Sequence, residues 1–120
     1  TGEKSCFFNE IDNNLPNKKE KKTTPFSNIC SELFNIINAR SIYPSEKSYT
    51  TQLLTRGSNT ILKKIGEETA EFIMACKDND KNSISNEAAD IIYHLQVALH
   101  HKGVEWRDVL TVLESRRKNK

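Results

Sequence analysis

Acidic residues recur at helical spacing in two places along the chain. Glu67, Glu68 and Glu71 form the first cluster, and Glu87 and Asp90 form the second. Residues three or four positions apart lie on one face of an α-helix, so each cluster presents its carboxylates together. Carboxylate oxygens are ligands for Mg²⁺, Mn²⁺ or Ca²⁺ rather than Zn²⁺, and Mg²⁺ is a common partner of polyphosphates. The spacing therefore indicates a divalent cation and phosphate chemistry, although acidic solvent faces of ordinary helices show the same pattern.

Each acidic cluster lies inside the apolar repeat of an amphipathic helix. The repeat predicts one long helix over about 59–77 and another over about 82–102, with a turn at 78–80 between them. Helices joined by so short a turn pack antiparallel. When their apolar stripes face each other, helical rotation brings four carboxylates to the same edge of the pair. These are Glu68, Glu71, Glu87 and Asp90.

The rest of the chain also has helical periodicity. We expect helices over about 26–40, 45–55 and 105–118, with Ser58 as a possible N-cap after the stop at Arg56 and Gly57. No segment has the pattern of a strand, so the predicted fold is an all-α bundle. The apolar stripes predict a group of buried side chains that includes Cys76, Leu95, Leu110 and Leu113.

Composition argues against several classes of protein. The chain has 18 Lys and Arg against 16 Asp and Glu, a net charge of +2, so no general basic field attracts nucleic acid. No apolar run approaches the roughly 20 residues that span a bilayer, and we expect no secretory signal. Cys6, Cys30 and Cys76 are odd in number and widely spaced. They indicate a reducing, cytoplasmic location rather than a disulfide framework.

The residues around the acidic clusters resemble those of the phosphoribosyl-ATP pyrophosphohydrolase family over about 48–116. The likeness rests on the run Lys-Lys-Ile-Gly-Glu-Glu at 63–68 and on Glu-Ala-Ala-Asp at 87–90, followed by Tyr93 and His94. It implies a helical bundle of the all-α nucleotide pyrophosphohydrolase type, assembled as a homodimer. It also implies Mg²⁺-dependent hydrolysis of phosphoribosyl-ATP to phosphoribosyl-AMP and pyrophosphate, the second step of histidine biosynthesis.

The resemblance also implies roles for individual residues. The expected metal ligands are Glu68, Glu71, Glu87 and Asp90. The catalytic candidates are Glu67, Glu68 and Glu71, with Glu67 as a group that orients water or acts as a general base. The substrate-binding candidates are Lys64, Tyr93 and His94, followed by Arg56, Lys63 and Arg116. In a dimer, Tyr49 or Arg116 could act in the partner's site. Lys64 could equally be no more than an ion-pair partner of Glu68.

The first residues of the chain resemble a second family. Residues 1–8 look like the end of a phosphoribosyl-AMP cyclohydrolase domain, in which the position of Cys6 is a zinc ligand. Residues 9–25, with their lysine run, have the composition of a linker. We therefore expect the helical domain at 26–120 to be the C-terminal part of a bifunctional protein with a fused cyclohydrolase domain ahead of it.

Two other functions stay open at this point. The chain could be a house-cleaning pyrophosphohydrolase of ordinary or damaged nucleoside triphosphates, which share the paired acidic motifs. It could also be a non-catalytic helical dimerisation module. Activity toward phosphoribosyl-ATP and its dependence on Glu68 and Asp90 would distinguish the three.

Overall fold

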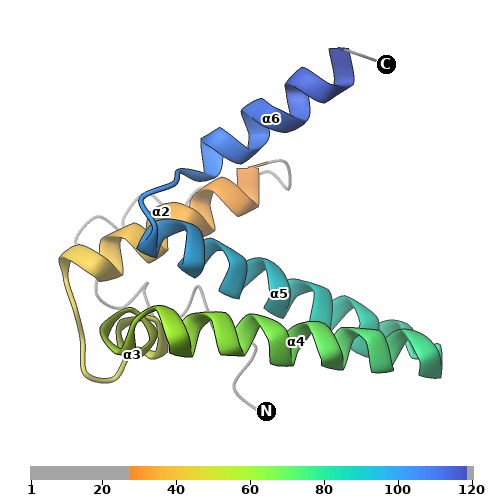
Figure 1. The fold of residues 1–120 in the computed structure, drawn as a ribbon. Helices are drawn as coiled ribbons and strands as arrows, with labels where there is room; N and C mark the ends of the chain where they lie inside the picture. The colour runs from red at the N-terminus through yellow and green to blue at the C-terminus, as the bar shows by residue number, and fades with distance from the viewer. Residues whose placement is uncertain (1–27, 119–120) are drawn as a thin grey trace.

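The computed structural model describes residues 28–118, and these residues form a bundle of helices (Figure 1). No strand occurs in that range, which confirms the predicted all-α class. The predicted cyclohydrolase remnant at 1–8 and linker at 9–25 lie outside the described residues. The helices are α2 (Ile29–Ile42), α3 (Tyr49–Arg56), α4 (Ser58–Asp78), α5 (Lys81–His101) and α6 (Trp106–Lys118).

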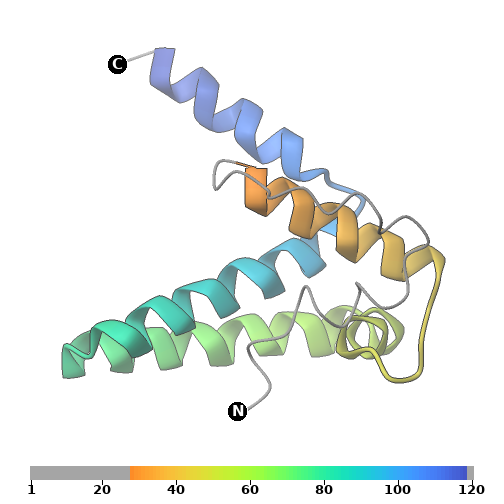
Figure 2. The ribbon, with the colours of Figure 1, turned by 180° about the vertical axis from the view of Figure 1, so that it is seen from behind.

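The long helices α4 and α5 form an antiparallel hairpin, and the contact between them is the most extensive in the molecule (Figures 1 and 2). Asn79 ends α4 in the left-handed conformation, with φ 58°. Asp80 then caps α5, because its side chain accepts a hydrogen bond from the Ser83 amide at 3.3 Å. The turn predicted at 78–80 is confirmed, and it fixes the relative register of the two acidic clusters.

The short helix α3 lies across one end of this hairpin (Figure 1). Ser48 caps it by accepting a hydrogen bond from the Thr51 amide at 3.1 Å. Gly57 follows with φ 92°, a conformation that glycine adopts readily, and α4 begins at once. The predicted capping role of Ser58 is wrong, because Gly57 occupies the cap position and Ser58 is already helical.

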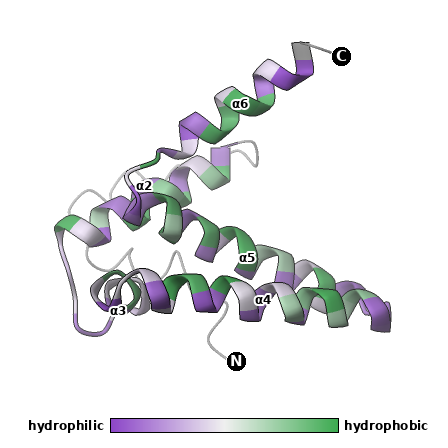
Figure 3. Cartoon of the chain, viewed as in Figure 1, coloured by the Kyte–Doolittle hydropathy of each residue, from purple (hydrophilic) through white to green (hydrophobic). Residues whose placement is uncertain are grey.

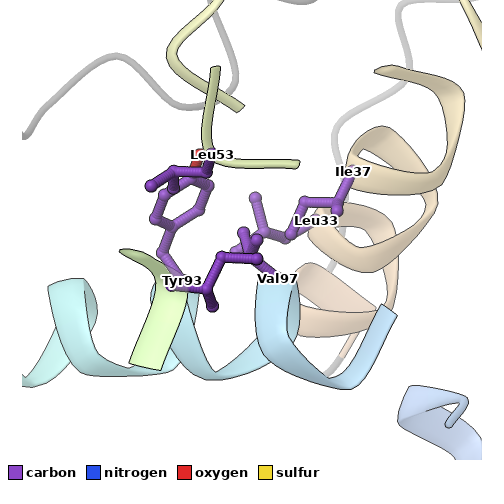
Figure 4. Close-up of a cluster of buried hydrophobic side chains, with 6 residues drawn as sticks. Leu33, Ile37, Leu53, Tyr93 and Val97 are labelled. Carbon is purple, nitrogen blue, oxygen red and sulfur yellow. The ribbon is translucent and has the colours of Figure 1, made fainter. Parts of the chain in front are cut away.

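The hydrophobic core lies where α2 and α3 pack on this end of the hairpin. Figure 4 shows Tyr93 and Val97 of α5 pointing toward Leu53 of α3 and toward Leu33 and Ile37 of α2. Ile61 of α4 completes the cluster. The core therefore anchors three helices around the middle of α5, one turn away from the second acidic cluster.

Several side chains that the apolar stripes predicted to be buried are exposed. Cys76 is exposed near the turn of the hairpin, and Leu95 is 38% exposed. Leu95 is exposed because α2 and α3 pack on the side of α5 that carries Tyr93 and Val97. The apolar stripe predicted from the aliphatic residues of α5 did not identify that side. Helix α6 packs against α2 and points away from the hairpin (Figures 1 and 2), so Leu110 and Leu113 are also exposed.

Hydrophobic residues alternate with hydrophilic ones along α6 and along both helices of the hairpin (Figure 3). Some of these hydrophobic side chains are exposed, among them Ile73 and Met74 of α4 and Leu110 and Leu113 of α6. Among the described helices, none combines the length and the apolar character needed to cross a bilayer.

A pair of buried hydroxyl groups ties α3 to α5, and it gives a stability prediction. The hydroxyls of Thr50 and Tyr93 share a hydrogen bond, and both residues are almost fully buried. Tyr93→Phe keeps the ring and removes this bond, so the free energy of unfolding should fall by about 1–2 kcal/mol. Urea denaturation followed by circular dichroism measures it. The control is Tyr43→Phe, because Tyr43 is 59% exposed. Equal stabilities of the two variants would contradict the prediction.

Candidate metal and phosphate site

Carboxylates from the two long helices converge halfway along the hairpin. Glu68 and Glu71 of α4 and Glu87 of α5 can each offer an oxygen such that the three atoms lie within 4.8 Å of one another. Glu68 is buried, with 3% of its surface exposed, while the other two are half-buried. The structure thus brings together three of the four residues that the sequence placed on one edge.

Asp90, the fourth of these residues, lies one turn further along α5. Its side chain is 2% exposed, and its charge acts on Glu68. It is not one of the three residues whose oxygens form the close group. Asp90 therefore adds negative charge beside the cluster, at the side that faces the core.

The cluster has an unfavourable electrostatic environment in the absence of a cation. Burial raises the pKa of Glu68, the charges of Glu71 and Asp90 raise it further, and Lys64 acts in the opposite direction. In addition, the Glu68 Oε1 atom is buried and accepts no hydrogen bond from the described residues. A divalent cation coordinated by hard oxygen ligands would relieve both the repulsion and the missing partner, so this donor set fits Mg²⁺.

Lys64 lies one turn before Glu68 on α4, at the rim of the cluster. Its Nζ atom is 3.5 Å from Glu67 Oε1 and 3.7 Å from Glu68 Oε2. Burial alone would lower the pKa of Lys64, but the neighbouring Tyr49, Glu68 and Glu67 outweigh it and the net shift is upward. Lys64 is therefore a permanent cation beside the carboxylates.

A tyrosine from α3 reaches the same region. Tyr49 Oη lies 3.1 Å from His94 Nε2, and His94 Nδ1 lies 2.8 Å from the carbonyl oxygen of Asp90. A carbonyl only accepts, so His94 donates from Nδ1 and its Nε2 accepts the Tyr49 proton. Burial lowers the pKa of His94, which keeps the ring neutral in this arrangement.

The sequence interpretation allowed Tyr49 a role in a partner's site, and that role stays a prediction. In the structure Tyr49 lies beside Lys64 and His94 of its own chain. The Ser48 cap places Tyr49 at the start of a helix, but it does not predict that this helix packs beside Lys64 and His94.

The remaining substrate-binding candidates are dispersed. Tyr93 is 1% exposed and belongs to the core, where it bonds Thr50. Arg56 and Lys63 are exposed at the junction of α3 and α4. Arg116 is exposed on α6, away from the hairpin (Figure 1). Roles for these residues, and the catalytic role of the exposed Glu67, stay predictions.

Comparison with known proteins identifies relatives over nearly the whole chain. A family model described as phosphoribosyl-ATP pyrophosphohydrolase matches residues 30–117. This range includes every helix that positions the carboxylate cluster.

Individual proteins are also similar to the chain, and each is named histidine biosynthesis bifunctional protein HisIE. The protein of Prochlorococcus marinus subsp. pastoris is 79% identical over 98% of this chain and 53% of its own length. That of Prochlorococcus marinus strain SARG is 59% identical over 100% of this chain and 54% of its own length. The Parasynechococcus marenigrum protein is 50% identical over 98% of this chain and 52% of its own length. The chain thus spans about half the length of the curated relatives it matches.

Proposed function

The chain belongs to the phosphoribosyl-ATP pyrophosphohydrolase family, and on that premise we propose that it hydrolyses phosphoribosyl-ATP to phosphoribosyl-AMP and pyrophosphate. We further propose Mg²⁺ as the cofactor. The observation that carries the proposal is the group of three carboxylates that Glu68, Glu71 and Glu87 form across α4 and α5, beside the ammonium of Lys64.

Each part of the site has a task in this reaction. Glu68, Glu71 and Glu87 would hold the metal, with Asp90 beside them. A bound Mg²⁺ neutralises phosphate charge and lowers the pKa of coordinated water.

Two groups at the rim complete the assignment. Lys64 is placed to bind a phosphate oxygen. Glu67, exposed one turn after Lys64, can accept a proton from the attacking water. His94 is neutral with both ring nitrogens engaged, so it acts by holding Tyr49 rather than as a proton carrier.

The relatives are longer than this chain, and they suggest what its parent protein contains. Their names describe bifunctional histidine biosynthesis proteins, and they are about twice the matched length. From the resemblance of residues 1–8, we propose that the parent of this chain carries a cyclohydrolase domain ahead of the helical domain. A cytoplasmic location fits the two free cysteines of the described region, Cys30 and Cys76.

We also propose that two copies of the chain associate. Leu62 and Ile73 of α4 are 51% and 55% exposed, and the helical repeat puts them on the same face with Gly66 between them. Apart from its chain neighbours and the adjoining backbone of α4, no atom of the described residues lies within 4 Å of where a Cβ of Gly66 would be. A second copy is the occupant that the family resemblance implies, and an exposed apolar face of this kind is typical of an interface.

Ile73→Glu tests the association. A charge buried in an apolar interface is costly, so this variant should have half the molar mass of the wild-type chain in light scattering at micromolar concentration. The control is Gln52→Glu, an exposed position on α3 outside this face, which should leave the mass unchanged. An unchanged mass for Ile73→Glu would remove this face from the interface.

The proposed substrate is tested by competition. The chain is given phosphoribosyl-ATP, ATP and dCTP in parallel with Mg²⁺, and pyrophosphate release is followed. Our proposal predicts the largest kcat/KM for phosphoribosyl-ATP. Faster turnover of ATP or dCTP would identify a house-cleaning enzyme instead, and no turnover of any of them would indicate a non-catalytic module.

A further inference from the structure

The Lys64 ammonium lies beside two carboxylates without closing on either, 3.5 Å from Glu67 Oε1 and 3.7 Å from Glu68 Oε2. A charge-assisted hydrogen bond between an ammonium and a carboxylate is shorter, about 2.7–2.9 Å. Such a close pair with Glu68 would occupy an oxygen that the metal needs. A group that draws the ammonium away from Glu68 would therefore keep the metal site open.

Tyr49 is the residue in position to do so. Its hydroxyl proton points to His94 Nε2 at 3.1 Å, and His94 is itself fixed by the Asp90 carbonyl at 2.8 Å. With its proton directed to His94, the Tyr49 oxygen acts as the acceptor in its side-chain hydrogen bond with Lys64. Lys64 is an electrostatic neighbour of that hydroxyl and is itself a donor without acceptor capacity. This series of hydrogen bonds ends at the backbone of α5, which the core holds in place.

We propose that Tyr49 is a positioning residue: anchored on His94, its hydroxyl holds the Lys64 ammonium away from the metal-binding carboxylate of Glu68 and keeps it available for a phosphate oxygen of the substrate. The role rests on the proposed metal site. In this role the Tyr49 hydroxyl must reach both Lys64 of α4 and His94 of α5. The Ser48 cap and the single residue Gly57 between α3 and α4 hold Tyr49 in that position.

The direction of the effect on metal binding separates this role from a structural one. Without the Tyr49 hydroxyl, Lys64 pairs with Glu68 and competes with the metal. Tyr49→Phe keeps the ring that packs against His94 and Tyr93, with centroids 5.9 and 6.1 Å away. It should weaken metal binding about three- to tenfold, the loss expected for one hydrogen bond of ordinary net strength. Lys64→Met removes the competing cation and should not weaken it.

The experiment is a titration of the full 120-residue chain with Mn²⁺, with free Mn²⁺ measured by electron paramagnetic resonance. We expect Tyr49→Phe to bind more weakly than wild type, and the double variant Tyr49→Phe/Lys64→Met to bind as Lys64→Met does. High Mg²⁺ should then restore turnover to Tyr49→Phe but not to Lys64→Met, because the metal can displace Lys64 from Glu68. Tyr43→Phe is the control and should bind as wild type does.

Each contrary result would overturn a different part of the proposal. Wild-type affinity in Tyr49→Phe overturns the positioning role, and so does a loss that persists in the double variant, since Tyr49 would then not act through Lys64. Absence of Mn²⁺ binding by the wild-type chain overturns the metal site itself, and this inference with it.

Discussion

Glu68→Gln should lower kcat/KM for phosphoribosyl-ATP about a thousandfold, since a catalytic metal supplies several kcal/mol of charge stabilisation in the transition state. Glu68 is the buried member of the carboxylate group, and within residues 28–118 one of its oxygens has no hydrogen-bond donor. The amide has nearly the same shape but supplies no negative charge to the metal. Pyrophosphate release at saturating Mg²⁺ measures the effect.

The matched control for this variant is Glu46→Gln. Glu46 is exposed in the segment before α3, so its substitution makes the same chemical change outside the site. Denaturation without metal should show that Glu68→Gln is at least as stable as wild type, so lost activity is not lost folding. A Glu68→Gln chain as active as the Glu46→Gln control would show that the cluster does not perform the reaction.

The second large effect is on stability. A ligand at a hundred times its dissociation constant stabilises the native state by about 2.7 kcal/mol if it does not bind the unfolded chain. Saturating Mg²⁺ should therefore raise the free energy of unfolding at pH 7.5 by about this amount. The increase should be absent in Glu68→Gln, because the cluster has lost its buried ligand.

The sign of the pH dependence follows from the raised pKa of Glu68. The folded chain binds this proton more tightly than the unfolded chain, whose glutamate titrates near 4.5. Without metal, the destabilisation from ionised Glu68 is absent below that value and grows as the pH rises through the higher folded value. Metal-free Glu68→Gln should thus be more stable than wild type at pH 7.5, and the gap should close toward pH 4.5.

Urea denaturation of both chains at several pH values, with EDTA or with Mg²⁺, measures these differences. Comparing the two chains cancels the titration of groups that they share. A gap that widens toward acid pH, or equal stabilisation of both chains by Mg²⁺, would be incompatible with a buried metal-binding Glu68.

The helices and the convergence of the carboxylates were predictable because both depend on local information. The apolar repeat sets each helix, and the two-residue link through Asn79 and Asp80 forces α4 and α5 together. Once two helices are antiparallel neighbours, the rotation of 100° per residue decides which flanks meet. The positions of Glu68, Glu71 and Glu87 could therefore be predicted without knowing how the remaining helices pack.

Burial and the position of Tyr49 depend on packing between distant segments. Leu95 is exposed and Tyr93 is buried because α2 and α3 approach α5 from one particular side, and the periodicity of α5 alone does not choose that side. Tyr49 and His94 are 45 residues apart in sequence. Their contact requires α3 to lie across the hairpin, which the sequence pattern does not specify.

The most direct test of the account is the identity of the products and their dependence on metal. The chain is incubated with phosphoribosyl-ATP in Mg²⁺ and, separately, in EDTA, and the phosphorus products are identified by ³¹P nuclear magnetic resonance. We predict equal amounts of phosphoribosyl-AMP and pyrophosphate in Mg²⁺ and no reaction in EDTA. Release of orthophosphate, or the same rate in EDTA, would contradict a metal-assisted cleavage between the α and β phosphates.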